Sequence, residues 1–189
     1  AAVTREAMRL VGERGPATLA IGEFHKNLLG SELPPTETLW SDVCHVVDLV
    51  RFMVGSEATE VTAYQDAHRS EWLNSYNALI RFDNDAVGIV TANRASGGRD
   101  LRSELHGIGV GCYMRIPDQI ETRQDNEEPV VISGAELAGA EPDDVNALDG
   151  ALAMHRHFAE CIRDGVTPST DVRDVINTSH LVDRLAGNG

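Results

Sequence analysis

The sequence predicts an α+β fold, in which mostly hairpin-linked strands form a sheet that carries helices on one face. Stretches in which apolar and polar residues alternate follow one another between residues 58 and 133. Segments with helical periodicity lie before and after this run, at residues 4–15, 40–55 and 146–185. Helices that are segregated from a series of strands indicate an α+β protein, not a βαβ succession.

The first strand follows directly on the first helix. Residues 4–15 have the pattern of a short amphipathic helix, with Thr4 as its N-cap and Gly15 as its end. Pro16 opens an extended run whose period of two separates its side chains onto two faces. One face holds Leu19, Ile21, Glu23, His25 and Asn27, and the other holds Ala20, Gly22, Phe24 and Lys26.

The remaining elements follow from similar local signals. Glycine and proline predict a loop at residues 30–38, and the helix after it is apolar almost all round, which is typical of a buried helix. Asp83-Asn84-Asp85 has the pattern of a hairpin turn. Further strands are expected at residues 101–117, 119–124 and 129–133, an acidic loop at 136–146, and closing helices at 146–165 and from Asp171, a good N-cap.

Composition limits the possible functions. A chain of 189 residues is long enough for one domain, which we expect to span residues 1–189. The formal net charge of −14 makes nucleic acids and anionic membranes poor partners, and no apolar run reaches the roughly 18 residues of a membrane span. Cys44, Cys112 and Cys161 are scattered, which favours a reducing cytoplasm over a disulfide framework or a structural zinc site.

The stretch WSDVCHVVDLVRFM, residues 40–53, places four polar residues at every third position of the apolar helix: Asp42, His45, Asp48 and Arg51. On an α-helix each of these residues is a neighbour of the next one. One interpretation is a buried ion network. The other is the wall of a cleft, where the carboxylate of Asp42 orients the imidazole of His45 and the imidazole moves a proton. Buried charges need partners in either case.

Three other residues are candidates for binding a substrate. His25 and Asn27 share a strand face and could hydrogen-bond a polyol or sugar, or could be solvated groups at a strand edge. Arg94, with Arg99, flanks a glycine-rich stretch that we expect to be a loop, from which it could hold an anionic or hydroxyl-rich substrate. Surface arginines are common, so both readings stay open. The GIGVG stretch at 107–111 lacks the spacing of a dinucleotide-binding loop.

Five stretches together resemble the C-terminal half of the glucose–fructose oxidoreductase / inositol dehydrogenase (Gfo/Idh/MocA) family. These stretches are HKN at 25–27, SDVCHVVDLVRFMVGSEATEVTA at 41–63, NALIRFDNDAVGIVTANRASGG at 77–98, RSELHGIG at 102–109 and HFAECIRDGVTPSTDVRDVINTSHLVDRL at 157–185. The resemblance covers nearly the whole chain in the same order. It implies an open-faced, mainly antiparallel sheet whose exposed face makes homo-oligomer contacts, behind an N-terminal Rossmann domain that is absent here.

The resemblance also implies residue roles. It makes His45 the acid/base at the oxidised hydroxyl, assisted by Asp42, and it makes His25 and Asn27 substrate contacts. The family's aspartate often lies four residues before the histidine, a position that Ser41 occupies here. The catalytic lysine of the family belongs to a Glu-Lys-Pro segment of the Rossmann half, for which Lys26, the only lysine of this chain, is not expected to stand in.

The sequence therefore predicts the substrate-binding and oligomerisation domain of a cytoplasmic NAD(P)-dependent dehydrogenase of sugars, cyclitols or related polyols. His45 and Asp42 are its expected catalytic pair, and His25, Asn27 and Arg94 its expected substrate contacts. NAD or NADP would be bound mainly by the missing half, so the chain alone should be inactive. The alternative is a non-catalytic sugar-binding or scaffolding relative. A weaker alternative is a metal-dependent hydrolase that uses Asp42, His45 and His25.

Overall fold

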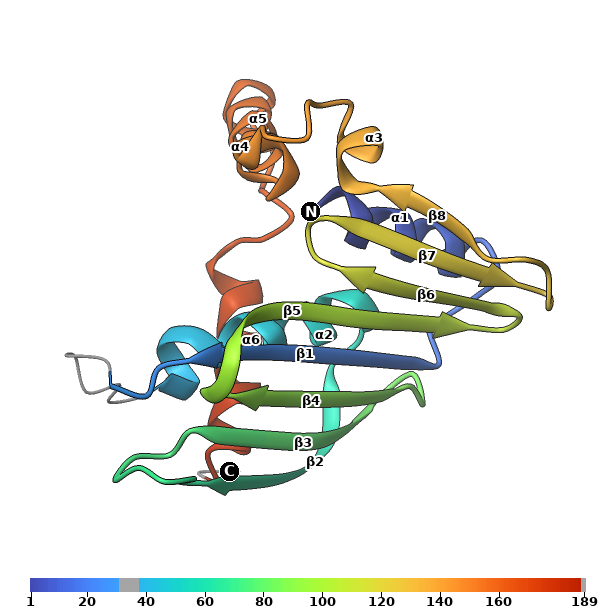
Figure 1. The fold of residues 1–189 in the computed structure, drawn as a ribbon. Coiled ribbons are helices and arrows are strands. Elements are labelled where there is room, and N and C mark those ends of the chain that lie inside the picture. The colour runs from blue at the N-terminus through green and yellow to red at the C-terminus, as the bar shows by residue number, and fades with distance from the viewer. Residues whose placement is uncertain (31–37, 188–189) are drawn as a thin grey trace.

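The computed structural model describes residues 1–30 and 38–187, and these residues form one eight-stranded sheet with helices against one of its faces (Figure 1). The strands are β1 (Leu19–Asn27), β2 (Ala58–Asp66), β3 (Ser75–Phe82), β4 (Val87–Asn93), β5 (Ala95–Gly107), β6 (Val110–Arg115), β7 (Gln119–Gln124) and β8 (Val130–Ser133). The helices are α1 (Ala2–Gly12), the π-helical segment η1 (Leu39–Val43), α2 (Cys44–Val54), α3 (Gly134–Ala138), α4 (Val145–Leu148), α5 (Ala151–Asp164) and α6 (Val172–Leu185). The predicted α+β class is confirmed.

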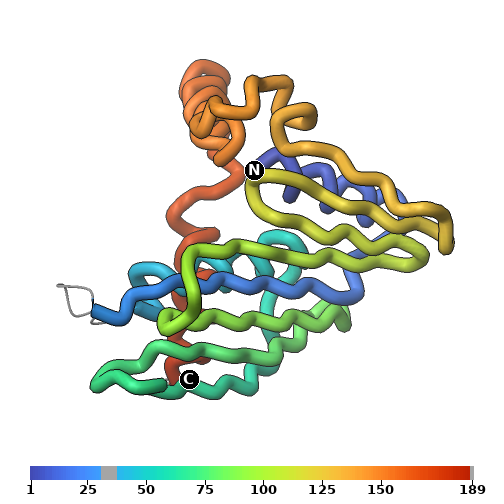
Figure 2. Tube along the Cα trace, in the orientation of Figure 1, coloured from blue at the N-terminus to red at the C-terminus, as the bar shows by residue number. Residues whose placement is uncertain are grey.

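Strand β1 lies in the middle of the sheet although it comes first in the chain. The strand order is β2-β3-β4-β1-β5-β6-β7-β8, and the early, blue part of the trace runs between later, green segments in Figure 2. β1 pairs in parallel with β4, and every other neighbouring pair is antiparallel. This central position brings residues 19–27 under helix α2, where the candidate residues of that helix lie.

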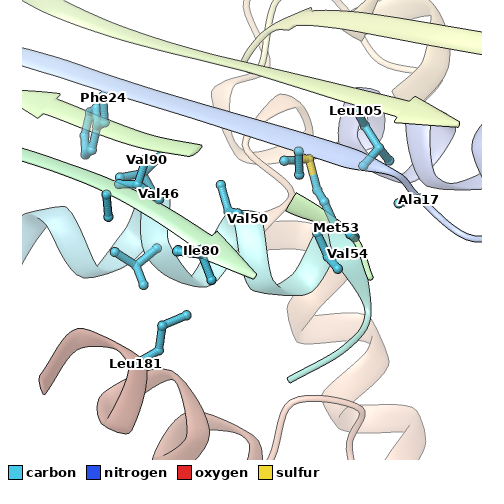
Figure 3. Close-up of a cluster of buried hydrophobic side chains, with 14 of the residues drawn as sticks. Ala17, Phe24, Val46, Val50, Met53, Val54, Ile80, Val90, Leu105 and Leu181 are labelled. Carbon is cyan, nitrogen blue, oxygen red and sulfur yellow. The ribbon is translucent and has the colours of Figure 1, made fainter. Parts of the chain in front are cut away.

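Helix α2 supplies the centre of the core. Val46, Val47 and Val50 are completely buried, and they face a group of buried side chains on the sheet and on α6, part of which Figure 3 shows: Phe24, Ile80, Val90 and Leu181. The helix approaches β1 so closely because residue 22 is a glycine. A Cβ built at Gly22 would lie 2.6 Å from Val46 Cγ2 and 2.7 Å from Val50 Cγ2.

Replacing Gly22 by alanine should therefore lower the free energy of unfolding by about 1–3 kcal/mol, because the added methyl group overpacks the contact between α2 and β1. Urea denaturation of the chain measures the change. Gly97→Ala is the matched control, since a Cβ at Gly97 meets no atom within 4 Å. Equal stability of the two variants would show that α2 can move away from the sheet without cost.

Several element boundaries differ from the sequence-based expectation. The first helix begins at Ala2, and Thr4 is a buried residue within it instead of an N-cap. The expected loop after Arg94 is wrong, because β5 already begins at Ala95. The acidic loop at 136–146 contains the end of α3 and the start of α4. The loop predicted at residues 30–38 falls almost entirely outside the described residues.

Arg51 joins α2 to two other parts of the fold. Its side chain is only 9% exposed and lies 2.6 Å from Glu57 Oε1 and 2.8 Å from Asp174 Oδ1, at the start of α6. The hydrogen bond from Arg51 lowers the pKa of Glu57 below its ordinary value. Since the unfolded chain then binds more protons than the folded one, this contribution to stability is lost as the pH falls below about 4.3.

We expect Glu57→Gln to flatten the loss of stability of the chain on acidification below about pH 4.3. The effect should be small, because Glu57 is 57% exposed and solvent screens the pair. Urea midpoints recorded at successive pH values measure it, with Glu60→Gln as a control. Glu60 is exposed and makes no ion pair with any residue in the described ranges. Parallel pH profiles for the native chain and Glu57→Gln would exclude this role for the Arg51 pair.

The two faces of the sheet differ in what covers them. Helices α1, α2 and α6 contact one face, whereas α5 packs mainly against α4 and most of its residues are exposed. The other face is open and carries Leu79, which is 52% exposed, beside Ile89 and Ile21. Val90, the residue after Ile89, belongs to the core under α2. Within the described part of the chain, no helix combines the length and apolar character that a membrane span requires.

Candidate functional site

The four polar residues of the α2 region point to different places. A regular spacing of three predicts one continuous α-helix, but Asp42 belongs to the π-helical segment η1, and α2 begins only at Cys44. A π-helical turn contains more residues than an α-helical one, and such turns are frequent at functional sites. The carboxylate of Asp42 consequently reaches toward the ends of β1 and β4, and no hydrogen bond joins it to His45 among the described residues.

Two cations hold Asp42. Lys26, at the end of β1, donates a hydrogen bond to Asp42 Oδ1, and Arg94 Nε, which follows β4, lies 2.7 Å from Asp42 Oδ2. The side chain of Asp42 is 16% exposed and that of Lys26 is 25% exposed. Both oxygens of this carboxylate are thus bound by cations in a largely buried position.

Arg94 is the most buried member of this group. Its side chain has no exposed surface, and it donates a hydrogen bond to the carbonyl oxygen of Phe24. Burial lowers the pKa of its guanidinium, and the charge of Asp42 acts in the opposite direction. Arg94 Nη2 is buried and has no hydrogen-bond partner among the described residues. We expected Arg94 to lie in an exposed loop, and this is wrong, because its side chain is buried beneath the surface.

The ring of Phe24 is surrounded by positive charge. Lys26 Nζ and Arg94 Cζ each lie 4.6 Å from its centroid, and Arg99 Cζ, on β5, lies 5.7 Å from it. Distances of this size allow cation–π attraction. Arg99 is exposed and forms no ion pair with another residue in the described ranges. We call these four residues with Asp42 the Phe24 cluster: Phe24, Lys26, Asp42, Arg94 and Arg99.

His45 is exposed on the first turn of α2 and has no hydrogen-bond partner among the described residues. It lines two hollows. The larger one, of about 730 Å³, lies between α1, α2, α5 and the segment before α6, and includes Asp48, His157 and Glu160. The smaller one, of about 260 Å³, is lined by His45 together with Arg99, Leu101 and Asp149, among others. An imidazole at the junction of two hollows can exchange a proton with a bound molecule.

Asp48 and Arg51 are bound to α6 and make structural contacts. Thr178, on α6, donates a hydrogen bond to Asp48 Oδ1, and Arg51 pairs with Glu57 and Asp174. The interpretation as an ion network therefore applies to Asp48 and Arg51, at the C-terminal end of this row of polar residues. At the other end His45 lines two hollows, and its role in proton transfer stays a prediction.

His25 and Asn27 share a strand face, as the alternation predicted, but it is the face away from α2. Lys26, between them, points toward Asp42, and Phe24 is buried beneath α2. His25 Nδ1 accepts a hydrogen bond from the backbone N–H of Asn93, and Asn27 Oδ1 accepts one from Leu29 N–H. The structure does not bring these two residues together with His45, and their hydrogen bonds fix the end of strand β1.

Sequence reasoning set Lys26 aside, yet the structure places it in the cluster with Asp42. The signal was present in the alternation, which put Lys26 on the same face as Gly22 and Phe24. A charged residue at the end of a buried strand face requires a partner of opposite charge. Glu23, Glu32 and Glu37 all lie nearer to Lys26 in the sequence than Asp42 does, and only the position of β1 beneath η1 shows that Lys26 and Asp42 meet.

The described residues do not fit a dinucleotide or a metal ion. No strand among them leads through a glycine-rich turn into a helix, which is the arrangement that binds a pyrophosphate. The GIGVG stretch forms the tight turn between β5 and β6, where Gly109 has a φ of +69°. In the parts of the chain that the structure describes, no group of three or more potential ligands could hold a metal.

Comparison with known proteins agrees with this architecture. Residues 31–108 match the family model described as the GFO/IDH/MocA C-terminal domain. The chain is 28% identical over 142 residues to the scyllo-inositol 2-dehydrogenase (NAD(+)) of Bacillus subtilis (strain 168), a match that covers 70% of this chain and 40% of the dehydrogenase. The chain thus spans less than half of this curated relative.

Solved structures share the complete fold at low sequence identity. An oxidoreductase from Agrobacterium radiobacter in complex with NAD+, L-tartaric acid and magnesium superposes with a TM-score of 0.80 and 17% identity, over 99% of this chain and 59% of its own. A levoglucosan dehydrogenase in complex with NADH and levoglucosan gives a TM-score of 0.80 and 16% identity, over 99% and 62%. The matched residues make this chain similar to the GFO/IDH/MocA C-terminal domain over residues 31–108, and the solved structures show that it shares their fold over nearly its whole length.

Proposed function

We propose that residues 1–189 are the substrate-binding and oligomerisation domain of an NAD(P)-dependent oxidoreductase that acts on a sugar, a cyclitol or a related polyol. The observation that carries this proposal is the exposed imidazole of His45, which lies at the junction of two hollows and has no hydrogen-bond partner in the described part of the chain. The names of the relatives support the substrate class, since one is a scyllo-inositol dehydrogenase and another a levoglucosan dehydrogenase.

In this proposal His45 is the residue of the chain that moves a proton. It takes the proton from a substrate hydroxyl during oxidation and returns it during reduction, which requires the hydroxyl within hydrogen-bond reach of the ring. Asp42 lies three residues before His45, and Arg94 and Lys26 position its carboxylate. Holding the hydroxyl and the imidazole together in the hollow supplies much of the rate enhancement.

The nicotinamide cofactor supplies the hydride chemistry when it is bound, and we propose that a separate Rossmann domain of the parent protein holds it. Because the described residues offer no cradle for a pyrophosphate, the isolated chain should be inactive. Titration of the chain with NADH, followed by cofactor fluorescence, should show no saturable binding. Micromolar affinity would contradict the assignment of the cofactor to another domain.

Activity of the parent protein tests the proposal directly. We expect the reading frame of the parent protein to encode a glycine-rich Rossmann turn and a Glu-Lys-Pro segment upstream of this chain. The purified parent protein should form NADH or NADPH, detected by absorbance, with at least one member of a panel of sugars and cyclitols. Absence of turnover and of cofactor binding in the parent would favour the second candidate function.

That second candidate is a non-catalytic sugar-binding or scaffolding relative of the same fold. The observation that favours it is the pairing of Asp42. Its carboxylate binds Lys26 and Arg94 and does not bind the imidazole of His45 in the described residues. Ser41, at the position where the family often has its aspartate, points in the same direction. A parent protein that binds a polyol without oxidising it would support this function.

Two further proposals concern assembly and location. The open sheet face, with exposed Leu79 beside Ile89 and Ile21, suits contact with a second copy of the chain, since apolar residues on a broad exposed face favour association. Sedimentation of the parent protein measures its oligomeric state. Three free cysteines suit a reducing compartment, so we place the protein in the cytoplasm.

A further inference from the structure

Positive charge gathers beside His45 in a chain that is otherwise strongly acidic. The net charge of the chain is −14, yet three cationic side chains lie within 6 Å of the Phe24 ring centroid. The proposed proton transfer uses two of them, Lys26 and Arg94, to position Asp42. It does not use Arg99, which is therefore the part of the cluster that needs a separate explanation.

The nearby carboxylates do not neutralise the cluster. Asp42 is the only acid that pairs with a cation of the cluster among the described residues, so one negative charge stands against three positive ones. Asp100, next to Arg99 in β5, pairs with Arg102 at 2.7 Å and Arg115 at 3.5 Å. Asp149 lines the smaller hollow but makes no ion pair with Arg99, and its charge acts on the amino group of Ala1.

The cluster also contains a buried donor without a partner. Arg94 has no exposed surface, and its Nη2 makes no hydrogen bond within the described part of the chain. An unpaired buried donor on a charged group is costly, and a surplus of positive charge beside it adds to that cost. The electrostatic cost of the surplus positive charge falls when an anion approaches the cluster from the exposed side, where Arg99 lies.

We propose that the smaller hollow binds an anionic group of the substrate, a carboxylate or a phosphate, through Arg99. The proposal rests on the function proposed above and names its substrate class as an acidic polyol: a sugar acid or a sugar phosphate. Arg99 and His45 line the same hollow, so the anionic group and the reacting hydroxyl belong to one molecule. The guanidinium of Arg99 provides the planar fork of donors that matches a carboxylate or phosphate.

In this proposal the two hollows bind different parts of the substrate. Because His45 lines both, a molecule that pairs with Arg99 at one end passes the imidazole and extends toward the larger hollow. There Asp48 and Glu160 offer carboxylate acceptors for hydroxyl groups. Lys26 and Arg94 stay bound to Asp42 and contribute positive potential without touching the substrate.

Binding of small probes to the chain tests the proposal. The probes are D-gluconate, D-glucose 6-phosphate and, as the neutral control, D-glucose, each titrated while the NMR signals of the His45 ring are followed. Arg99→Gln removes the charge that is proposed to bind. Arg81→Gln makes the same change on the open sheet face, where Arg81 is 53% exposed and its only partner in the described residues is Asp85 at 3.8 Å. Urea midpoints verify that both variants fold.

We expect at least one acidic probe to shift the His45 signals saturably, and D-glucose not to do so at the same concentration. Arg99→Gln should weaken that binding about tenfold or more, since a charge-assisted hydrogen bond is lost. Arg81→Gln should leave it unchanged, and raising the ionic strength should weaken it. Equal binding of D-glucose and the acidic probes, or an unchanged affinity in Arg99→Gln, would overturn the inference.

Assays of the parent protein distinguish a failure of this inference from a failure of the proposed function. If it oxidises neutral polyols with a dependence on His45, and Arg99→Gln changes kcat/KM for no acidic substrate, the inference fails while the function stands. If the chain binds an acidic probe through Arg99 but the parent transfers no hydride, the binding site stands and the dehydrogenase function fails.

Discussion

Replacing His45 by alanine in the parent protein should lower kcat by about 10²–10⁴-fold, the usual contribution of a positioned acid/base group. The physical reason is that no other imidazole among the described residues lines both hollows, so none can replace His45 as the acid/base. His157, which lines the larger hollow, is engaged with Ser169: its Nε2 accepts a hydrogen bond from Ser169 N–H at 3.2 Å. Initial rates of cofactor reduction under saturating substrate measure the effect.

The control for this prediction is another exposed histidine. His180 lies on α6 and makes no hydrogen bond with a residue in the described ranges, so His180→Ala changes the same side chain outside both hollows. Its kcat should equal that of the unmodified protein. Turnover of His45→Ala at the unmodified rate would exclude His45 as the acid/base, and an equal loss in both variants would indicate a general effect on folding.

Replacing Asp42 by asparagine should lower the free energy of unfolding of the chain by about 3–5 kcal/mol, the typical cost of breaking a buried ion pair. Among the residues that the structure describes, Asp42 is the only carboxylate that pairs with Arg94, whose side chain is completely buried. The substitution preserves the shape of the side chain but leaves the guanidinium uncompensated in a poorly solvated place. Urea denaturation measures the loss.

A double-mutant cycle identifies the cause of that loss. Arg94→Met removes the buried charge and keeps an unbranched side chain of similar length, while Lys26 still pairs with Asp42. The double variant Asp42→Asn, Arg94→Met should therefore be more stable than Asp42→Asn alone, because no buried charge is left unpaired. Additive losses in the two single variants would show that the pair is not coupled and that Arg94 is solvated in the native protein.

The element types could be predicted because they depend on local patterns. The alternation in residues 19–27 separated Phe24 and Lys26 from His25 and Asn27, and the structure keeps that separation. Asp171 was expected to cap a helix, and its side chain accepts hydrogen bonds from Arg173 N–H and Asp174 N–H. Such features are set by neighbours within a few residues, for which sequence spacing is a sufficient guide.

The membership of the candidate site could be predicted only in part. His45 was a candidate from its place on an apolar helix, and it lies at the two hollows. Its expected partnership with Asp42 is absent among the described residues, because η1 is π-helical and turns the carboxylate toward β1 and β4. Arg94 was expected on the surface and is buried, since β5 begins at the next residue instead of after a loop.

By itself the sequence determined the α+β class, most strands and helices, and the resemblance to the GFO/IDH/MocA C-terminal domain. All three depend on periodicity and on the order of motifs, which can be read along the chain without knowledge of its folding. Only the tertiary structure decided which charges meet. Insertion of β1 between β4 and β5 brings Lys26, Arg94 and Arg99 around one aromatic ring, although more than 70 positions separate the first from the last of them. Asp42 pairs with two of these cations. Electrostatic energy depends on distance in space and on burial, and neither is encoded in the spacing of residues along the chain.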